Sequence, residues 1–493
     1  EFFKNAQKEG GVYVDDTGGE FKMMTLLKAR EEGLVGPTQT DLDKLRPGVN
    51  RKITFLKPTA DGEAFEVAAR HDAIINAQRK TREVELYIPQ DEVKGIGHGV
   101  PTFEQLATLG VRARHLAGEK GTVLALLSQH PVLGKYVPKG SEITPGDIRD
   151  VLSGAKLPLH GESGRSLQDA WDDVWNKDPK VGVVDDSNFL QSEFYTNPRY
   201  RSRTRQALQD LTRTELTRSL IDKTASPPAL TQAGAALYAN VMKNPALSEA
   251  ETGSIIFRSS FTGEDRPGKS GAGQYESYVD RKIAEQMLGK DAVDEQFNKL
   301  GAALETNDPA VIAKARAAHN AFMGPARVAA AIGVVESTWM PEPIENNAAE
   351  QFFLKHIGPT VVVQACMTPD ISGVMISRNT DNGARGQVTF QLVKGFGGGV
   401  DGGKATEGVI KQGGADVGFI DGTPVDGADQ NVTVGGIEVS SADMQKLREI
   451  VLETEKFFQE TVEPGKGYAV DMEVARQHGE WRIVQARVLL MDK

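Results

Sequence analysis

Residues 254–278 read SIIFRSSFTGEDRPGKSGAGQYESY, and this stretch decides how the second half of the chain is organised. Its first four residues are suited to a short buried strand. The strand leads into Arg258 and two serines, followed by a glycine-rich loop whose backbone N–H groups can approach phosphate oxygens closely. An arginine here can bind a phosphoryl group through two parallel hydrogen bonds. The stretch therefore predicts an anion site, since an ordinary surface loop does not account for so long a string.

Two strands are predicted near the end of the sequence, at residues 468–474 and 481–487. Residues two apart share one face of a strand, so the polar side chains of each strand line up together. With the turn centred near His478, Asp471 would lie roughly opposite Gln485. One face then carries four polar side chains: Asp471, Glu473, Gln485 and Arg487. Carboxylate and amide oxygens suit Mg²⁺, so the pair predicts a metal-binding face, with a plain surface hairpin as the alternative.

Two further motifs are weaker in isolation. Lys120 stands in a glycine turn before an apolar, helix-like run, where a lysine can reach a phosphate, although a solvated turn is the simpler interpretation. Gln364 lies in the β-branched run 360–366, the clearest strand of the chain. The end of that strand can present Gln364 and backbone groups to an adenine edge, and a core strand is the alternative. Cys366 is expected to be a packed apolar residue, because no histidine lies near it in sequence.

The composition narrows the class of protein. With 39% hydrophobic and 25% charged residues, the chain is of ordinary globular type, and its 493 residues predict two or three domains. The net charge of -11 argues against a nucleic-acid-binding protein but leaves room for a nucleotide. A single cysteine excludes an internal disulfide, and no apolar run is long enough for a membrane helix. A cytoplasmic protein is the expectation. The chain begins at Glu1, which leaves open the removal of a leader or an upstream domain.

Local patterns suggest how the remaining segments are organised. Residues 1–95 carry no chemical motif; within them, 63–82 favour a helix and 83–88 alternate like a strand. Residues 161–250 are mainly helical, with six arginines between 199 and 218, and a solvated helix is favoured there over an anion-binding or partner-binding patch. Further elements are predicted as follows: a helix capped by Thr144, helices over 281–332 and 442–461, and strands at 374–377 and 387–394.

Taken together and in this order, the motifs resemble the nucleotide-binding domain of the phosphoenolpyruvate synthase and pyruvate phosphate dikinase family. Its relatives include the rifampicin phosphotransferases and the glucan water dikinases. The resemblance covers about residues 118–487, patchily from 150 to 250, and is most specific from Arg258 to Tyr278. It implies an α+β chain with an ATP-grasp-like domain in three parts: an unassigned region (1–95), a first lobe (96–253) with a helical insertion at about 161–250, and a second lobe (254–493).

The same resemblance implies ATP and Mg²⁺ as cofactors and assigns the site residues. Lys120, Arg258 and Arg487 would contact the ATP phosphates, with Arg258 and Arg487 as the catalytic pair. A loop would close over the phosphates through Ser270, Gly271, Gly273 and Gln274. Gln364 would lie at the adenine. The metal would be held by Asp471, Glu473 and Gln485.

The family moves the β-phosphoryl group of ATP to a histidine on a separate domain, leaving AMP. The eight histidines here lack the glycine-rich context of that residue, and His160, the nearest loop candidate, is rejected. The resemblance therefore implies a phosphotransferase module whose histidine or other acceptor lies in another protein or in a missing segment. Two alternatives stay open: a non-catalytic ATP-binding regulatory or interaction module, and an ATP-dependent ligase that forms ADP.

Overall fold

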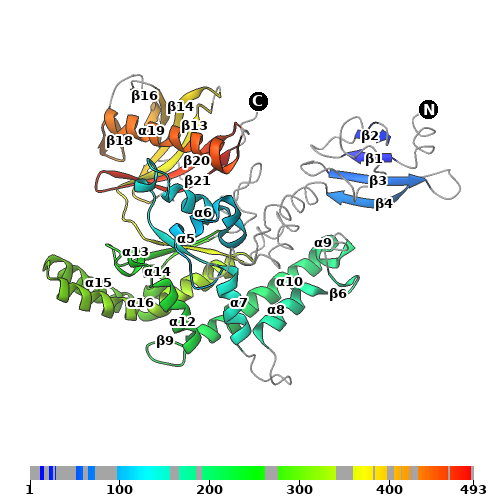
Figure 1. Ribbon diagram of the computed structural model, residues 1–493, viewed down its shortest axis with the longest axis horizontal. Helices are drawn as coiled ribbons and strands as arrows, with labels where there is room; N and C mark the ends of the chain where they lie inside the picture. Colours follow the sequence, from blue (N-terminus) through cyan, green and yellow to red (C-terminus); the bar gives the residue numbers. More distant parts are fainter. Residues whose placement is uncertain are drawn as a thin grey trace. The chain divides into compact units, whose positions relative to one another are not determined.

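The computed structural model divides into two compact units, and each is considered separately. One unit comprises Glu1–Pro89, Trp175–Thr204 and Ala348–Phe353, and the other Gln90–Val174, Arg205–Asn347 and Leu354–Lys493. The structure describes residues 12–15, 22–25, 28, 52–58, 65–72, 97–155, 166–184, 191–260, 276–339, 359–380, 383–396, 405–411, 414–420, 423–424, 431–464 and 467–489 (Figure 1). The division into an N-terminal region and two lobes stays a prediction.

The first unit contains an antiparallel sheet with the strand order β2-β1-β3-β4. Its strands are β1 (Val12–Asp15), β2 (Lys22–Thr25), β3 (Lys52–Pro58) and β4 (Phe65–Asp72). The helix predicted at 63–82 is wrong over β4, because Phe65 and Val67 alternate with polar residues and pair with Pro58 and Leu56 of β3. Pairing with the preceding strand overrides local helix propensity here. The strand predicted at 83–88 lies outside the described residues.

A four-stranded antiparallel sheet with the order β11-β10-β12-β5 forms the centre of the second unit. Its strands are β5 (Gly140–Ile143), β10 (Ile255–Ser259), β11 (Ser277–Val279) and β12 (Val361–Ala365). The predicted strands at 254–257 and 360–366 are confirmed as β10 and β12. Strand β5 was not predicted, and it pairs with β12 from the middle of the range assigned to the first lobe.

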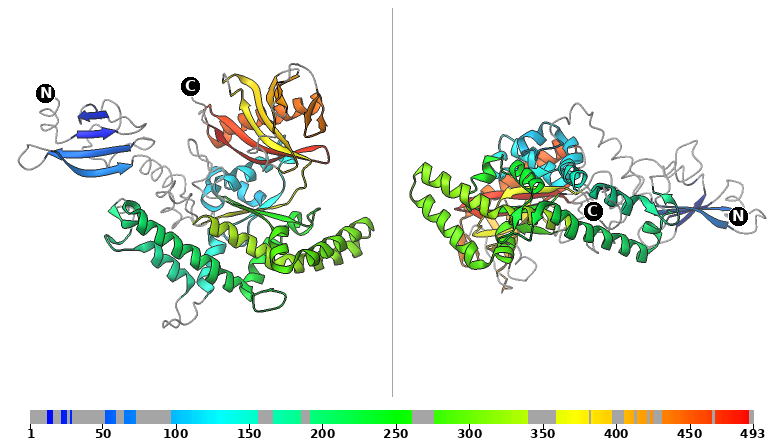
Figure 2. Two further views of the ribbon diagram at one scale, coloured as in Figure 1. Left: turned by 180° about the vertical axis from the view of Figure 1, so that it is seen from behind. Right: turned by 90° about the horizontal axis from the view of Figure 1, so that it is seen from below.

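Helices cover this sheet. The longest, α16 (Pro309–Ser337), runs along β10 and β11 and packs with α14 (Asp280–Leu288) and α15 (Lys290–Glu305), as both views of Figure 2 show. The side chain of Asp308 caps α16 and proline occupies its first position, so the helices predicted over 281–332 are confirmed. Four fully buried residues form the core between these helices: Ala284, Val293, Met323 and Ala326.

The predicted helical stretch from 161 to 250 is also present. It contains α8 (Leu167–Asn176), α9 (Glu193–Thr196), α10 (Pro198–Asp210), a π-helical segment (Leu211–Leu216), α11 (Thr217–Leu220), α12 (Gln232–Val241) and α13 (Pro245–Ser248). Before it, Thr144 caps α7 (Pro145–Gly154) as predicted. Two of the clustered arginines make surface ion pairs, Arg213 with Glu336 and Arg218 with Glu215.

The second unit also contains a seven-stranded antiparallel sheet, in the order β17-β16-β15-β14-β13-β20-β21, and a two-stranded sheet of β18 (Val432–Val434) and β19 (Ile437–Val439). The strands are β13 (Ile371–Arg378), β14 (Arg385–Lys394), β15 (Thr406–Lys411), β16 (Gly414–Ile420), β17 (Thr423–Pro424), β20 (Ala469–Gln477) and β21 (Glu480–Leu489). Helix α19 (Ser441–Phe457) covers one face of this sheet (Figure 1). The four strands and the helix predicted in this region are confirmed; β15, β16 and β17 were not predicted.

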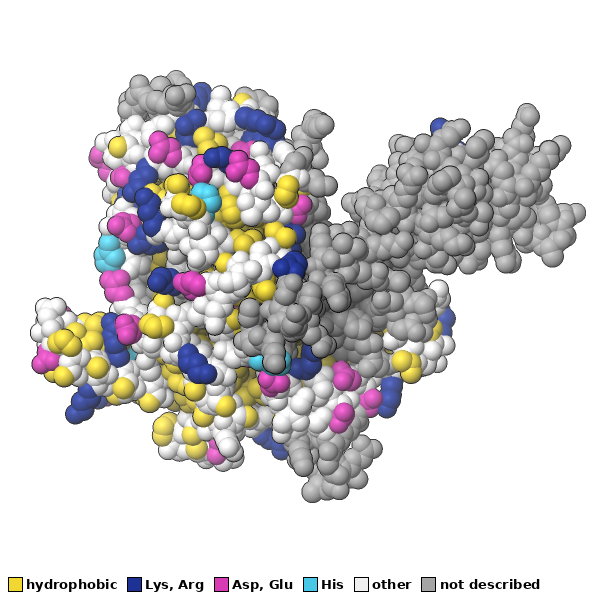
Figure 3. All heavy atoms as spheres, viewed as in Figure 1, with side chains coloured by type: hydrophobic (Ala, Val, Ile, Leu, Met, Phe, Trp, Pro, Cys, Tyr) yellow, Lys and Arg dark blue, Asp and Glu magenta, His cyan; other side chains and the backbone are white. Residues whose placement is uncertain are grey.

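The two sheets of the second unit are bridged by α6 (Arg114–Ser128), which packs against β12 of the first and β21 of the second. On the face seen in Figure 3, acidic and basic side chains are interspersed over the described part of the surface. Such mixing does not favour a polyanion-binding face. None of the described helices combines the length and the apolarity that crossing a bilayer requires.

Candidate functional site

A cavity of about 420 Å³ lies in the second unit and is lined by residues of both sheets. Strands β10 and β12 contribute Arg258 and Gln364, whereas β20 and β21 contribute Asp471, Glu473 and Arg487. Five of the predicted site residues therefore line one cavity, although the sequence places them in segments more than a hundred residues apart. A cavity of this size is in the range that small-molecule ligands occupy.

The register of β20 and β21 differs from the prediction. Asp471 lies opposite Arg487, not Gln485, and Gln485 lies opposite Glu473. The turn consists of His478 and Gly479, both with positive φ, which is the tight hairpin type that matches strand twist. A β-bulge then adds one residue, Val484, to β21. The turn is centred between His478 and Gly479, half a residue later than predicted, and this moves each pairing partner in β21 by one residue. The bulged residue moves it by one more. Because the total shift is two residues, the polar side chains predicted for the two strands still lie on the same face.

The bulge also explains how β21 stays amphipathic. Before it, Trp481 and Ile483 are buried; after it, Ala486 and Val488 are. Ile483 and Val488 pair with Val474 and Val470 of β20 respectively, so the bulge keeps the apolar residues on one face when strict alternation would separate them. The cavity face consequently keeps Gln485 and Arg487 next to the two carboxylates of β20.

Arg258 joins the two predicted motifs directly. Its Nη2 donates to Glu473 Oε2 and to Gln485 Oε1, each at 2.8 Å. Its Nη1 donates to the carbonyl oxygen of the bulged residue Val484, also at 2.8 Å. Arg258 is buried, but the side chain of Glu473 is 44% exposed. The arginine is thus held rigidly against β21, while the carboxylate beside it stays accessible from the cavity.

A second arginine–carboxylate pair lines the same cavity. Arg487 donates from Nε and Nη2 to one carboxylate oxygen of Asp471, at 2.8 and 2.6 Å. Both side chains are largely buried. The predicted phosphate-binding arginines and the predicted metal-binding carboxylates therefore neutralise each other across this wall.

The opposite wall is formed by β12 and the residues that follow it. Gln364 is buried and donates from Nε2 to the carbonyl oxygen of Pro138 at 3.0 Å. Cys366 also lines the cavity, and burial together with the negative charge of Asp280 raises the pKa of its thiol to about 12. The thiol therefore stays protonated at neutral pH and is a poor nucleophile, as the expectation of a packed residue requires.

Lys120 occupies a different place. It lies in α6, just after a break at Gly118, whose φ of 61° and ψ of -171° are not helical. The predicted glycine turn is therefore a kink within the helix. Lys120 is buried and is not among the residues that line the cavity. The loop residues predicted to close over the phosphates, Ser270, Gly271, Gly273 and Gln274, lie outside the described part of the chain.

Among the cavity residues that were given no role at the site are Pro138, Val484 and Phe396. Val484 contributes through its backbone carbonyl oxygen, which the residue type does not reveal. The side chain of Phe396 is 58% exposed, and among the described residues it is the aromatic member of the exposed large apolar side chains. The available signal for it was an aromatic residue between two glycines.

Oxygen donors at and beside the cavity are of the kind that Mg²⁺ prefers. Asp471 and Glu473 line the cavity with their carboxylates, whereas Gln485 is buried, is not among the lining residues and accepts from Arg258 through its amide oxygen. Within the described residues, no group of three or more His, Cys, Asp and Glu side chains is arranged to hold a metal. Two carboxylates suffice only where substrate phosphates and water complete the octahedron.

Comparison with known families assigns the region that contains the cavity to a family. The family model described as "Pyruvate phosphate dikinase, AMP/ATP-binding domain" matches residues 115–491. The match includes Lys120 in α6, both sheets of the second unit and every described residue of the cavity wall named above. A search of curated proteins found no significant match.

Proposed function

The chain belongs to the family of the pyruvate phosphate dikinase AMP/ATP-binding domain, and on that premise we propose that it is the ATP-Mg²⁺-binding module of a phosphotransferase. The phosphoryl group would pass from ATP to a histidine or another acceptor supplied by a different domain or protein. The two antiparallel sheets with a ligand cavity between their strands support an ATP-grasp-like arrangement of the second unit.

One observation carries the proposal: Arg258 from the glycine-loop motif is bonded to Glu473 and Gln485 from the C-terminal motif inside a cavity. The side chain of Glu473 is 44% exposed, so its carboxylate can be reached from the cavity although Arg258 is buried. A cavity lined by two arginines and two carboxylates is suited to a ligand that carries both anionic groups and a metal cation.

The proposed pose follows from the cavity walls. The adenine would lie along residues 364–367, where the amide nitrogen of Gln364 is committed to Pro138 and its oxygen can accept from the adenine amino group. The phosphates would point towards Arg258 and Arg487, with Lys120 approaching from α6. The loop containing Ser270, Gly271, Gly273 and Gln274 would close over them.

The arginines and carboxylates of the cavity would change partners when the nucleotide binds. Without nucleotide, Arg258 and Arg487 are balanced by Glu473 and Asp471. On binding, the two arginines would turn their remaining donors to phosphate oxygens. Asp471, Glu473 and Gln485 would hold Mg²⁺, which would neutralise charge on the transferred group. The protein would contribute position and electrostatic stabilisation, which dominate catalysis of phosphoryl transfer.

The product formed from ATP tests this proposal. The chain is incubated with Mg²⁺, a separately supplied histidine-bearing acceptor domain and ATP labelled at each phosphate in turn, and the nucleotide product and any phosphorylated species are identified. The expected result is AMP, with the β-phosphoryl group on the acceptor and the γ-phosphoryl group released to water or inorganic phosphate. ADP would favour the ligase alternative, and tight ATP binding with no turnover in the presence of any acceptor domain would favour the regulatory module.

Glu473→Gln sharpens the test, because it keeps a hydrogen-bond acceptor for Arg258 but removes the charge needed for the metal. We expect Mg²⁺-ATP to lose most of its thermal stabilisation, which for the wild type at a hundredfold excess over Kd is about 2.7 kcal/mol. Glu455→Gln is the matched control, since Glu455 also accepts from an arginine, Arg378, on the same sheet but away from the cavity. Equal thermal shifts in both variants would reject the metal site.

A further inference from the structure

The hydroxyl of Ser260 is inserted into helix α6 beside Lys120. Ser260 directly follows β10 and is completely buried. Its Oγ accepts a hydrogen bond from the backbone N–H of Gly121 at 2.7 Å and donates one to the carbonyl oxygen of Ala117. One side chain from the Arg258 strand therefore binds two backbone groups of the Lys120 helix.

The two backbone groups are those that a continuous helix would bond to each other. In an α-helix the N–H of residue i donates to the carbonyl of residue i−4, which for Gly121 is Ala117. The hydroxyl of Ser260 bonds to both, and the backbone at Gly118 between them leaves the helical region. Insertion of a side chain into the helical ladder is a recognised cause of a kink. Ser260 thus stabilises the break that precedes Lys120.

Close contacts surround the hydrogen bonds between Ser260 and helix α6. A Cβ at Gly121 would come within 2.3 Å of the Glu142 carboxylate, so the helix and β5 are in close contact there. The hydroxyl of Thr122 donates to the carbonyl of Gly118 at 2.6 Å, which closes the first turn after the break. On the other side, the N–H of Ser260 donates to the carbonyl of Thr360 next to β12 at 3.2 Å.

We infer that Ser260 is a positioning residue for nucleotide binding, whose hydroxyl fixes Lys120 relative to Arg258. Arg258 lies two residues before Ser260, and Lys120 directly precedes the Gly121 N–H that Ser260 binds. The two proposed phosphate ligands are therefore connected through a single hydroxyl and a few backbone bonds. This inference rests on the proposed function, because it assumes that Lys120 contacts the phosphates of ATP.

A double-mutant cycle with two ligands tests the inference. Dissociation constants for ATP and for adenosine are measured by calorimetry for the wild type, Ser260→Ala, Lys120→Ala and the double variant. Loss of the hydroxyl leaves two buried backbone groups without their partner, so Ser260→Ala is expected to weaken ATP binding roughly tenfold. In the Lys120→Ala background the same change should alter ATP affinity less than about twofold, because coupled residues are not additive. Adenosine has no phosphate, and its affinity should change less than about twofold throughout.

Two variants separate positioning from general destabilisation. Ser377→Ala removes another fully buried serine hydroxyl that accepts a backbone N–H, that of Val470, and should leave the ratio of the two ligand affinities unchanged. Ser260→Thr keeps the hydroxyl and should restore ATP affinity to within about threefold of the wild type even if Ser260→Ala does not fold.

The inference is overturned if Ser260→Ala weakens ATP and adenosine equally, if its effect persists in the Lys120→Ala background, or if Ser260→Thr binds ATP no better than Ser260→Ala. A wild-type chain that binds no ATP would instead reject the proposed function, and the inference with it. If the wild type and Lys120→Ala bind ATP equally well, Lys120 does not contact the phosphates. The proposed ATP site in the cavity would then stand, but the inference about Ser260 would be rejected.

Discussion

Two arginine–carboxylate pairs in the second unit have the same N–O distance of 2.8 Å and opposite settings. Arg258 meets Glu473 at the cavity, where the carboxylate side chain is 44% exposed. Arg327 meets Asp280 between α16 and α14, where the two side chains are 1% and 0% exposed. Distance alone would rank the pairs as equal, so their difference lies in what surrounds them.

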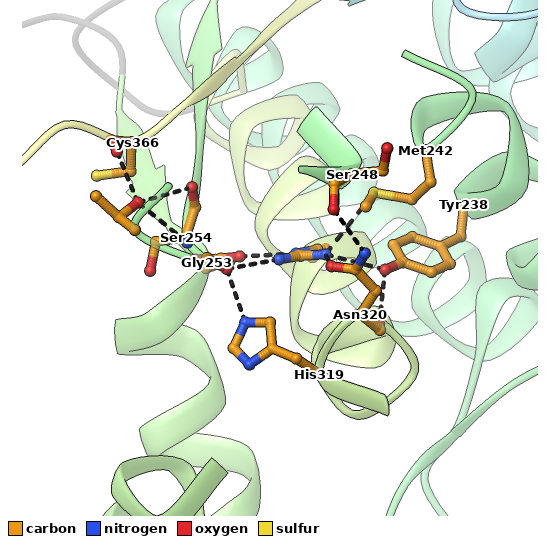
Figure 4. A network of polar contacts seen from close by, with 11 residues as sticks. Tyr238, Met242, Ser248, Gly253, Ser254, His319, Asn320 and Cys366 are labelled. Carbon is orange, nitrogen blue, oxygen red and sulfur yellow. Dashed lines mark hydrogen bonds and ion pairs between the residues drawn. The ribbon is translucent and has the colours of Figure 1, made fainter. Parts of the chain in front are cut away.

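Arg327 belongs to a network of polar contacts, of which Figure 4 labels Tyr238, Gly253, His319 and Asn320 among others. Besides Asp280, its guanidinium donates to the carbonyl of Gly253, the hydroxyl of Tyr238 and the side-chain oxygen of Asn320. All of these acceptors belong to the protein. One carboxylate oxygen of Asp280 accepts from Arg327, while the other is buried without a hydrogen-bond partner. A buried charge held by several protein groups links the elements that carry it, whereas Arg258 and its half-exposed carboxylate are accessible to a ligand.

Arg327→Ala should produce the largest effect on stability. It leaves the Asp280 carboxylate buried without its cation, which typically costs about 3–5 kcal/mol. Urea unfolding followed by circular dichroism measures the free energy of unfolding. Arg213→Ala is the control, because the Arg213 side chain is 59% exposed and such surface pairs contribute about 0–1 kcal/mol. If Arg327→Ala lowers the free energy of unfolding by less than about 1 kcal/mol, the network does not stabilise the packing of its helices.

Arg258→Ala should show the converse behaviour. We expect ATP affinity to fall by about a hundredfold or more, because hydrogen bonds between charged groups contribute about 1.5–3 kcal/mol each. The stability of the free protein should change less than in Arg327→Ala, since water can solvate the half-exposed Glu473. Calorimetry with Mg²⁺-ATP and urea unfolding measure the two quantities. If Arg258→Ala binds ATP normally but has a much lower free energy of unfolding, Arg258 stabilises the fold and does not bind the nucleotide.

Local sequence patterns predicted some elements of the second unit and missed others. The helix cap at Thr144 and the main strands around the cavity were predicted, because caps and β-branched runs are local signals. The strand β5 was not, since Gly140–Ile143 is extended only through its pairing with β12. The helix predicted over β4 was wrong for a related reason, because β4 is extended through its pairing with the preceding strand β3.

The candidate site was predictable as a set of residues but not as a geometry. The bulge at Val484 sets which residue faces which, and its only trace in the sequence is a slip in the alternation of apolar residues along β21. Arg258 and the C-terminal hairpin were expected together through the family resemblance, and the structure joins them by direct hydrogen bonds. The metal ligands, the roles of Lys120 and Gln364, and the loop at 270–274 stay predictions.

The smallest expected effect concerns the pH dependence of the network around Arg327. His319 is buried, with its Nε2 2.8 Å from the Gly253 carbonyl oxygen, and desolvation lowers its pKa below the ordinary 6.5. Between its lowered pKa and 6.5 the unfolded chain therefore binds a proton that the folded chain does not. The contribution of this group to stability is fully present above pH 6.5 and declines as the pH falls below it, by at most about 1.4 kcal/mol per pH unit.

His319→Gln removes the titrating group, so the difference in unfolding free energy between wild type and variant should be constant above pH 6.5 and shift in favour of the variant from there towards pH 5. Urea unfolding at half-unit intervals measures it, and His98→Gln, at an exposed side chain, controls for the substitution itself. A constant difference down to pH 5 would contradict the prediction. The cavity offers a comparison within the same molecule: the buried His319 resists protonation at the expense of stability in acid, whereas the half-exposed Glu473 is reachable by a ligand at the cavity wall.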